Sequence, residues 1–238
     1  MEHRDRLWPG GYTFLYDDGL FRPSTDTFLL GAFPRLRRGM TVCELGAGTG
    51  LLSLLLLARE PELTVTGVEL QPQACALFRR TAEKNGLQDR LHCLEGDLRQ
   101  GLLPPGRFRL AVANPPYFPP GAGAVAPDAA RRTARAETDC TLAQLCAAAA
   151  RALTWGGSFC LVHRPDRLAD VLEELRRVRL EPKRLRTVAR MADAAPSLVL
   201  VEARRGGKPG LRILPPLALC APDGTDSEEI RRIYHRRA

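Results

Sequence analysis

The sequence has no apolar run of about 18 or more residues, the length that a membrane-spanning helix needs. It does not begin with a charged leader followed by an apolar stretch and a cleavage site, so we expect neither membrane insertion nor secretion and predict a cytoplasmic protein. Its seven cysteines include no Cys-x-x-Cys pair and fall mostly within apolar patterns. That placement is typical of reduced, buried thiols, and we expect neither disulfides nor a metal site.

Lysine is also scarce, because only three of the 35 basic residues are lysines. The formal net charge is nonetheless +8, and residues 163–238 hold 17 basic against 11 acidic residues. This excess favours a polyanionic partner that is bound through its phosphates. A general preference for arginine and a solvated charged surface explain the same numbers. The basic run at 231–237 fits an RNA-contacting helix end as well as a soluble tail.

The chain alternates between short apolar runs and segments of helical spacing, which predicts an α/β fold with a parallel sheet. Its 238 residues suit a single domain, with residues 1–39 as an N-terminal segment packed on a domain of residues 40–238. The expected strands are 41–45, 64–69, 91–95, 108–113, 157–163, 184–189 and 197–203. The expected helices are about 50–58, 72–85, 140–153 and 165–178, with Trp155-Gly156-Gly157 as the stop of the third.

A glycine-rich stretch, Glu44-Leu-Gly46-Ala-Gly48-Thr-Gly50, follows the first expected strand and precedes a helix. Such a turn lets the backbone approach a ligand, and the helix offers free N–H groups to a carboxylate. Leu51 replaces the last glycine of the dinucleotide fingerprint, which argues against a pyrophosphate cofactor. Glu69 ends the next strand, where it can accept two ribose hydroxyls, and Asp97 follows the third, where it can receive an adenine amino group.

The most informative residues are Asn114-Pro115-Pro116-Tyr117, which end the apolar run 108–113. The Asn114 side-chain oxygen and the Pro115 carbonyl are two fixed acceptors beside a flat aromatic ring, and this set suits a planar NH2 group. Its nitrogen is a poor nucleophile, so acceptors that hold both hydrogens and aim the lone pair at an electrophile assist the reaction. We expect the electrophile to be a bound methyl donor.

Each feature alone also has a structural explanation. Any doubly wound domain carries a turn at its first strand, Glu69 fits a solvated strand end, and Asp97 fits a loop or cap residue. The two prolines after Asn114 would also stop a strand. One such feature at each successive strand end is, however, what a ligand lying across the carboxyl edge of an open sheet requires.

These residues resemble the class I S-adenosylmethionine-dependent methyltransferases of the Asn-Pro-Pro-Tyr type over nearly the whole chain. Within that family, the segments 21–33 and 206–216 are similar to those of bacterial tRNA(Val) adenine-N6 methyltransferases, which modify the adenine just 3′ of the anticodon. The resemblance implies a doubly wound, Rossmann-like sheet of seven mostly parallel strands with the last strands antiparallel. It also implies S-adenosylmethionine as the cofactor and tRNA as the partner.

By the same resemblance, the site divides into a cofactor part and a substrate part. The residues implied to hold the cofactor are Glu44, Gly46, Gly48 and Gly50 at its methionine end, Glu69 at its ribose and Asp97 at its adenine, with Asn114 at the border. Asn114 and Pro115 would bind the target amino group while Tyr117 stacks on the flipped base. Thr25 and Asp26 match a segment near the cofactor, but Ser24, Thr25 or Asp26 would equally cap a helix running to Phe33. No general base is needed, because the ammonium group formed on methyl transfer is acidic enough to lose a proton to water.

Two glycine- and proline-rich stretches are candidate substrate contacts. Residues 119–127 lead into Arg131, Arg132 and Arg135, which fits a gate that orders on RNA or a plain loop. Residues 204–210 contain Lys208 and fit an RNA contact or a turn between strands. Other amino-group substrates remain open at this point, namely DNA adenine, rRNA guanine and protein glutamine. An alternative that is not an enzyme is a catalytically silent scaffold that binds nucleic acid. The sequence does not indicate the oligomeric state in either case.

Overall fold

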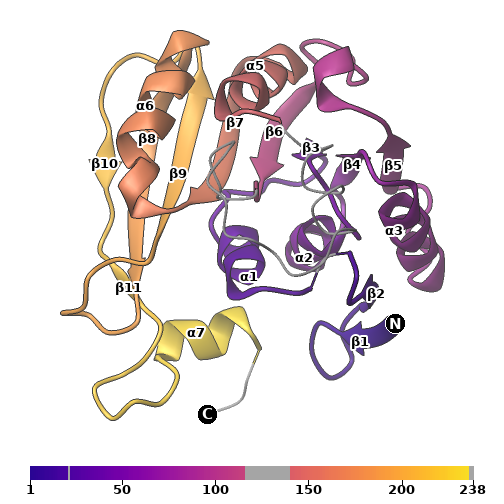
Figure 1. Cartoon of the computed structure of the whole chain (residues 1–238), viewed down its shortest axis with the longest axis horizontal. Helices are drawn as coiled ribbons and strands as arrows, with labels where there is room; N and C mark the ends of the chain where they lie inside the picture. The colour runs from indigo at the N-terminus through magenta and orange to yellow at the C-terminus, as the bar shows by residue number, and fades with distance from the viewer. Residues whose placement is uncertain (21, 116–139, 236–238) are drawn as a thin grey trace.

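The computed structural model describes residues 1–20, 22–115 and 140–235. In this part of the chain a nine-stranded sheet has the order β10-β8-β9-β7-β6-β3-β4-β5, and β11 also pairs with β8 (Figure 1). Its strands are β3 (Thr41–Leu45), β4 (Thr64–Glu69), β5 (Leu91–Glu95), β6 (Phe108–Ala113), β7 (Leu153–His163), β8 (Leu180–Ala189), β9 (Leu198–Arg205), β10 (Arg212–Ile213) and β11 (Leu217–Ala218). The seven predicted strands are all present, and two short strands extend the β8 edge.

The direction of the strands follows the predicted pattern. Strands β5, β4, β3, β6 and β7 pair in parallel, while β9 pairs antiparallel with both β7 and β8. The expected antiparallel pairing of the two late strands is therefore confirmed. Only β9 runs against the others, because β10 and β11 pair with β8 in parallel.

Helices cover both faces of the sheet. They are α1 (Thr25–Ala32), α2 (Leu51–Arg59), α3 (Pro72–Lys84), α5 (Leu142–Ala152), α6 (Leu168–Arg177) and α7 (Glu228–Ile233), with 3-10 turns at Leu98–Gln100 and Pro165–Arg167. Alternate strand residues point to opposite layers: Val42 and Val112 pack with α1, α2 and α3, whereas Cys43 and Ala113 pack with α5 and α6. Strands buried on both faces explain the continuous apolar runs in the sequence.

The two ends of the chain meet beside α1. The hairpin of β1 (Glu2–Arg6) and β2 (Thr13–Asp17) is held to α3 because Asn85 Oδ1 accepts from Thr13 N at 2.8 Å. At the other end, Tyr234 after α7 stacks on Phe28 of α1, with ring centroids 4.5 Å apart. Figure 1 shows α7 and the N-terminal hairpin on the same side of the molecule. The termini thereby flank α1, the helix that precedes the first strand of the nine-stranded sheet.

One predicted boundary is wrong. Helix α5 ends at Ala152, and Trp155-Gly156-Gly157 lies inside β7 rather than at the helix stop. The pairing of β7 with β6 shifts register between Phe108 and Leu110, and Gly156 has a φ of 78° at this irregularity. The two glycines thus serve a bulge that bends the start of the strand.

Candidate active site at the carboxyl edge of the sheet

Three neighbouring parallel strands end at one edge of the sheet with the residues that the sequence singled out. Strands β6, β3 and β4 are adjacent, and they are followed by Asn114, by the glycine loop and by Glu69 at the end of β4 itself. The carboxyl ends of adjacent parallel strands lie side by side, which is where ligands bind in open α/β sheets. The structure therefore brings the glycine loop, Glu69 and Asn114 to one edge.

The glycine loop is fixed to the neighbouring strand through its backbone. The N–H groups of Gly46 and Ala47 donate to the Val68 carbonyl at 3.0 and 2.9 Å. Gly46, Gly48 and Gly50 all have left-handed φ values, of 74°, 52° and 84°. At Gly50 space is also short, since a Cβ atom there would lie 2.2 Å from the Phe78 ring. Glycine is required for this turn, which opens the N-terminus of α2 without a side-chain cap.

Glu69 connects the end of β4 to that loop. Its carboxylate is buried, with the residue 7% exposed, and accepts from Gly48 N at 2.8 Å and from Gln71 N at 2.9 Å. A carboxylate has about four acceptor positions, so two remain for further donors. This geometry fits a residue that takes two ribose hydroxyls while it holds the loop in place.

Glu44 lies deeper, beneath the same loop. Its carboxylate accepts from both the backbone N–H and the hydroxyl of Ser53 in the first turn of α2, and the residue is 3% exposed. Burial raises the pKa of Glu44 to about 8, and the nearby Glu69 adds to the rise. Its contacts join β3 to α2. Ser53 is not among the predicted site residues, although it is the one polar residue in the run of leucines from 51 to 57.

Asp97 caps the 3-10 turn that follows β5. It accepts from Arg99 N at 2.8 Å and forms an ion pair with the Arg99 guanidinium at 2.5 Å. The hydrogen bond from the Arg99 side chain lowers the pKa of the Asp97 carboxyl. These contacts match the cap interpretation of Asp97, and its contact with the cofactor adenine stays a prediction.

Asn114 is held by a residue that the sequence-based argument did not single out. Its Nδ2 donates to Oγ1 of Thr27 at 3.0 Å, and Thr27 is 2% exposed in the first turn of α1. Ser24 occupies the N-cap position but makes no side-chain cap hydrogen bond, and its hydroxyl instead lies 3.2 Å from Thr27 Oγ1. The segment 24–27 thus touches the Asn-Pro-Pro-Tyr motif directly. Thr27 lies two residues after Thr25, and this closeness to a predicted site residue was the signal that could have identified it.

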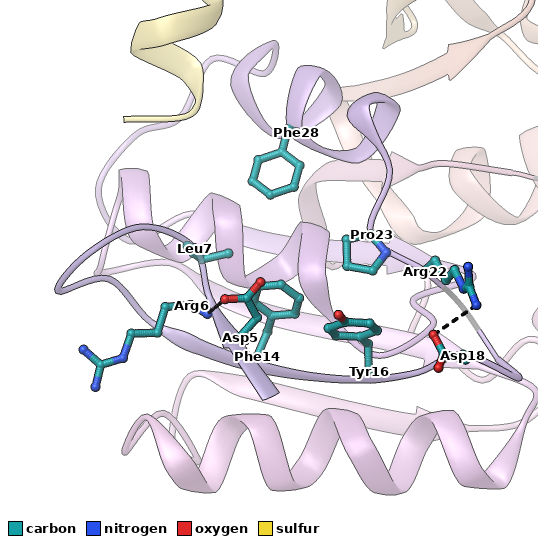
Figure 2. Close-up of a pocket in the computed structure, with 9 residues that line it drawn as sticks. All are labelled: Asp5, Arg6, Leu7, Phe14, Tyr16, Asp18, Arg22, Pro23 and Phe28. Atoms are coloured by element: carbon teal, nitrogen blue, oxygen red, sulfur yellow. Dashed lines mark hydrogen bonds and ion pairs between the residues drawn. The ribbon is translucent and has the colours of Figure 1, made fainter. Parts of the chain in front are cut away.

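A cavity of about 480 Å³ opens between the N-terminal hairpin and the start of α1. Figure 2 shows Phe28 facing Phe14 and Tyr16 across it, with the Asp18–Arg22 ion pair of 3.2 Å at one end. Its other lining residues are Asp5, Arg6, Leu7 and Pro23. Neither Glu69 nor Asn114 lines this cavity, whereas Phe28 does, and it is the neighbour in α1 of Thr27, which bonds Asn114.

Lys208 is the one predicted substrate contact that lies among the described residues, and it is not at this edge. Because β9 runs antiparallel, it ends at the amino edge of the parallel strands, where Gly206 N donates to the Arg179 carbonyl at 2.9 Å. Lys208 follows this turn and therefore lies at the edge opposite Asn114. Pro115 follows Asn114 at the carboxyl edge and is half-buried. Tyr117, Arg131, Arg132 and Arg135 lie outside the described residues.

Part of the C-terminal basic excess is used inside the fold. Arg186 donates to both carboxylate oxygens of Glu229 at 2.6 and 2.8 Å, and Arg184 pairs with Glu202. All seven cysteines are free, and four of them are buried. Among the described residues no three His, Cys, Asp or Glu side chains are grouped as a metal site would need. No described helix is long and apolar enough to cross a membrane.

The family model of the methyltransferase small domain matches residues 23–179. The chain belongs to this family. Its methyl donor is S-adenosylmethionine, as the resemblance implied, and the chain is a methyltransferase. The match begins two residues before α1 and spans the glycine loop, Glu69 and the Asn-Pro-Pro-Tyr motif, so it covers the whole strand-end site.

Two curated relatives of this methyltransferase carry the name tRNA1(Val) (adenine(37)-N6)-methyltransferase. The protein from Yersinia enterocolitica is 32% identical over 182 residues, which cover 74% of this chain and 71% of the relative. The protein from Porphyromonas gingivalis is 33% identical over 191 residues, 77% of this chain and 74% of the relative. Among solved structures, a predicted O-methyltransferase from Agrobacterium tumefaciens superposes with a TM-score of 0.74 at 20% identity, over 90% of this chain and 97% of that one. This last likeness confirms the α/β fold class.

Proposed function

We propose that this methyltransferase transfers the methyl group of S-adenosylmethionine to N6 of adenine 37 in tRNA1(Val). Two curated relatives that share about a third of their residues with it bear that name. The Asn-Pro-Pro-Tyr sequence supports the same chemistry independently, because its acceptors suit an exocyclic amino group. The observation that carries the proposal is the position of Asn114 at the end of β6, beside the strand whose glycine loop begins the cofactor site.

In this scheme the chain's residues bind and orient, and the cofactor supplies an electrophilic methyl group. Glu69 accepts the two ribose hydroxyls with its remaining acceptor positions, and Asp97 shares its carboxylate between Arg99 and the adenine amino group. The Asn114 oxygen and the Pro115 carbonyl each accept one hydrogen of the target amino group, so the nitrogen lone pair faces the methyl group. Tyr117 stacks on the flipped base.

The proposed partner is tRNA, and the proposed compartment is the cytoplasm. A net charge of +8 favours binding to phosphates. Arg184 and Arg186 are paired with carboxylates, so we do not assign them to the tRNA. We assign the contacts near the site to Arg131, Arg132 and Arg135. Lys208 would contact a part of the tRNA that is remote from the target base. Remote contacts are compatible with a substrate as long as tRNA.

Transfer of a labelled methyl group from S-adenosylmethionine to unmodified total tRNA, followed by nucleoside analysis, tests this proposal. We expect label in N6-methyladenosine with the wild type and none with Asn114→Ala. Parallel reactions contain ribosomal RNA, DNA and a protein fraction. Label in one of these instead of tRNA would retain the methyltransferase and reject the substrate, whereas label in tRNA guanine would reject the target base.

A further inference from the structure

The carboxamide of Asn114 is tied to helix α1 by one hydrogen bond between residues 87 positions apart. Its Nδ2 donates to Thr27 Oγ1 at 3.0 Å. Thr27 Oγ1 lies 3.2 Å from Ser24 Oγ, so the threonine hydroxyl can donate its own hydrogen to Ser24 while it accepts from Asn114. Asn114, Thr27 and Ser24 thus form a chain of three hydrogen-bonded side chains.

This arrangement bears on which end of the amide faces the substrate. A carboxamide has a donor end and an acceptor end of nearly the same shape, and rotation by 180° exchanges them. In the structure Nδ2 points toward Thr27 and α1, which places Oδ1 on the opposite side, and donation from Thr27 to Ser24 would leave the threonine oxygen as the acceptor that favours this orientation. In the reverse orientation, an NH2 group would face the NH2 group of the target base, and neither could accept from the other.

The support of Thr27 is itself rigid. A β-branched side chain in a helix has few χ1 rotamers, and Thr27 is buried at the start of α1. Helix α1 packs closely on α2, since a Cβ atom added at Gly31 would lie 3.0 Å from Leu55 Cβ. The hydroxyl is thus held at a fixed place relative to the glycine loop that opens α2.

We propose that Thr27 is a positioning residue, which holds the Asn114 carboxamide with its oxygen toward the target amino group. The proposal rests on the function proposed above but adds a residue that touches neither the substrate nor the cofactor. It also gives the segment around Thr25 and Asp26 a role that differs from both helix capping and cofactor contact. Its effect is expected on the rate of methyl transfer rather than on binding.

A matched pair of variants tests this role. Thr27→Val keeps the β-branched shape and removes the hydroxyl, whereas Thr27→Ser keeps the hydroxyl. We expect kcat on tRNA to fall about 10-fold to 100-fold in Thr27→Val, the range that misplacement of a reacting group produces. Thr27→Ser should retain most of the activity. The Kd for S-adenosylmethionine, which also reports folding, should match that of the wild type in both variants. Equal kcat values for Thr27→Val and wild type would overturn the proposal.

The same Thr27 substitution made in the Asn114→Asp variant separates a positioning role of Thr27 from a structural one. In Asn114→Asp both ends of the side chain are acceptors, so rotation no longer matters. Thr27→Val should therefore cost much less when added to Asn114→Asp than when added to the wild type. The same loss in both backgrounds would mean that Thr27 only supports the fold. If Asn114→Asp is inactive, the comparison of Thr27→Val with Thr27→Ser decides alone.

One readout does not depend on activity. The Asn114 side-chain NH2 signals, assigned in 15N-labelled protein by their loss in Asn114→Ala, should shift and exchange faster in Thr27→Val but not in Thr27→Ser. Unchanged signals in Thr27→Val would contradict the hydrogen bond itself. If wild-type protein methylates no tRNA, the substrate proposal fails, while these signals still test the contact between Thr27 and Asn114.

Discussion

The Glu69 carboxylate accepts a hydrogen bond from Gly48 N at 2.8 Å, so the last residue of β4 holds the loop that follows β3. Both ends of this contact belong to the cofactor site that the sequence predicts. Loop shape and ribose recognition are therefore expected to depend on the same side chain.

Replacement of Glu69 should weaken cofactor binding. Hydrogen bonds to a charged group contribute about 1.5–3 kcal/mol each, so Glu69→Ala should raise the Kd for S-adenosylmethionine at least about tenfold in titration calorimetry. Asn114→Ala is the control, because its side chain is assigned to the target amino group, and its Kd should stay near that of the wild type. Equal losses of affinity in the two variants would contradict the assigned roles.

Gly50→Ala should destabilise the protein more than Gly39→Ala does. Both glycines have left-handed φ values, 84° and 69°, so both substitutions cost about 1–2 kcal/mol of backbone strain. A Cβ atom at Gly50 also meets the Phe78 ring at 2.2 Å, whereas one at Gly39 meets nothing within 4 Å. Overpacking adds about 1–3 kcal/mol at Gly50 alone. Chemical denaturation of both variants measures the difference, and equal free energies of unfolding would refute the close approach.

The buried Glu44 should make stability fall as the pH rises. Its folded pKa of about 8 lies above the ordinary value of 4.5 for this group, so the folded state holds the proton more tightly. The contribution is fully present below pH 4.5 and is lost as the pH rises through about 8, with a slope near 1.4 kcal/mol per pH unit between these values. Glu44→Gln has no such titration. The difference in unfolding free energy between wild type and Glu44→Gln should therefore change over pH 5–8, and a flat difference would contradict a raised pKa.

Tyr117 is expected to act through its ring. Base–aromatic stacking contributes about 1–3 kcal/mol, so Tyr117→Ala should lower kcat/KM on tRNA by about 5- to 150-fold. Tyr117→Phe keeps the ring and should stay close to the wild type. If both variants lose the same activity in steady-state methyl transfer, the hydroxyl and not the ring is needed.

The sequence predicts the central sheet because inner strands such as β3 and β6 are largely buried and read as apolar runs. It also predicts which residues share an edge, since Glu69, the glycine loop and Asn114 each follow a parallel strand. The hairpin strand Glu2–Arg6 was not predicted, because five polar or charged residues give no apolar alternation and the pairing with β2 alone defines it.

Side-chain partners were harder to predict than strand ends. Thr27 and Asn114 are 87 residues apart, and no local pattern links them. The pairing of Asp97 with Arg99 depends on the 3-10 turn that follows β5. Lys208, a predicted substrate contact, lies at the edge opposite Asn114 because β9 runs in the reversed direction. Each of these outcomes depends on how elements far apart in the chain pack, which residue spacing does not encode.

The most direct test of the proposed reaction compares two unmodified tRNA1(Val) transcripts, one with adenine and one with guanine at position 37, as acceptors of a labelled methyl group. The proposal predicts label in the adenine transcript, recovered as N6-methyladenosine, and none in the guanine transcript. Equal labelling of both transcripts would contradict adenine 37 as the target.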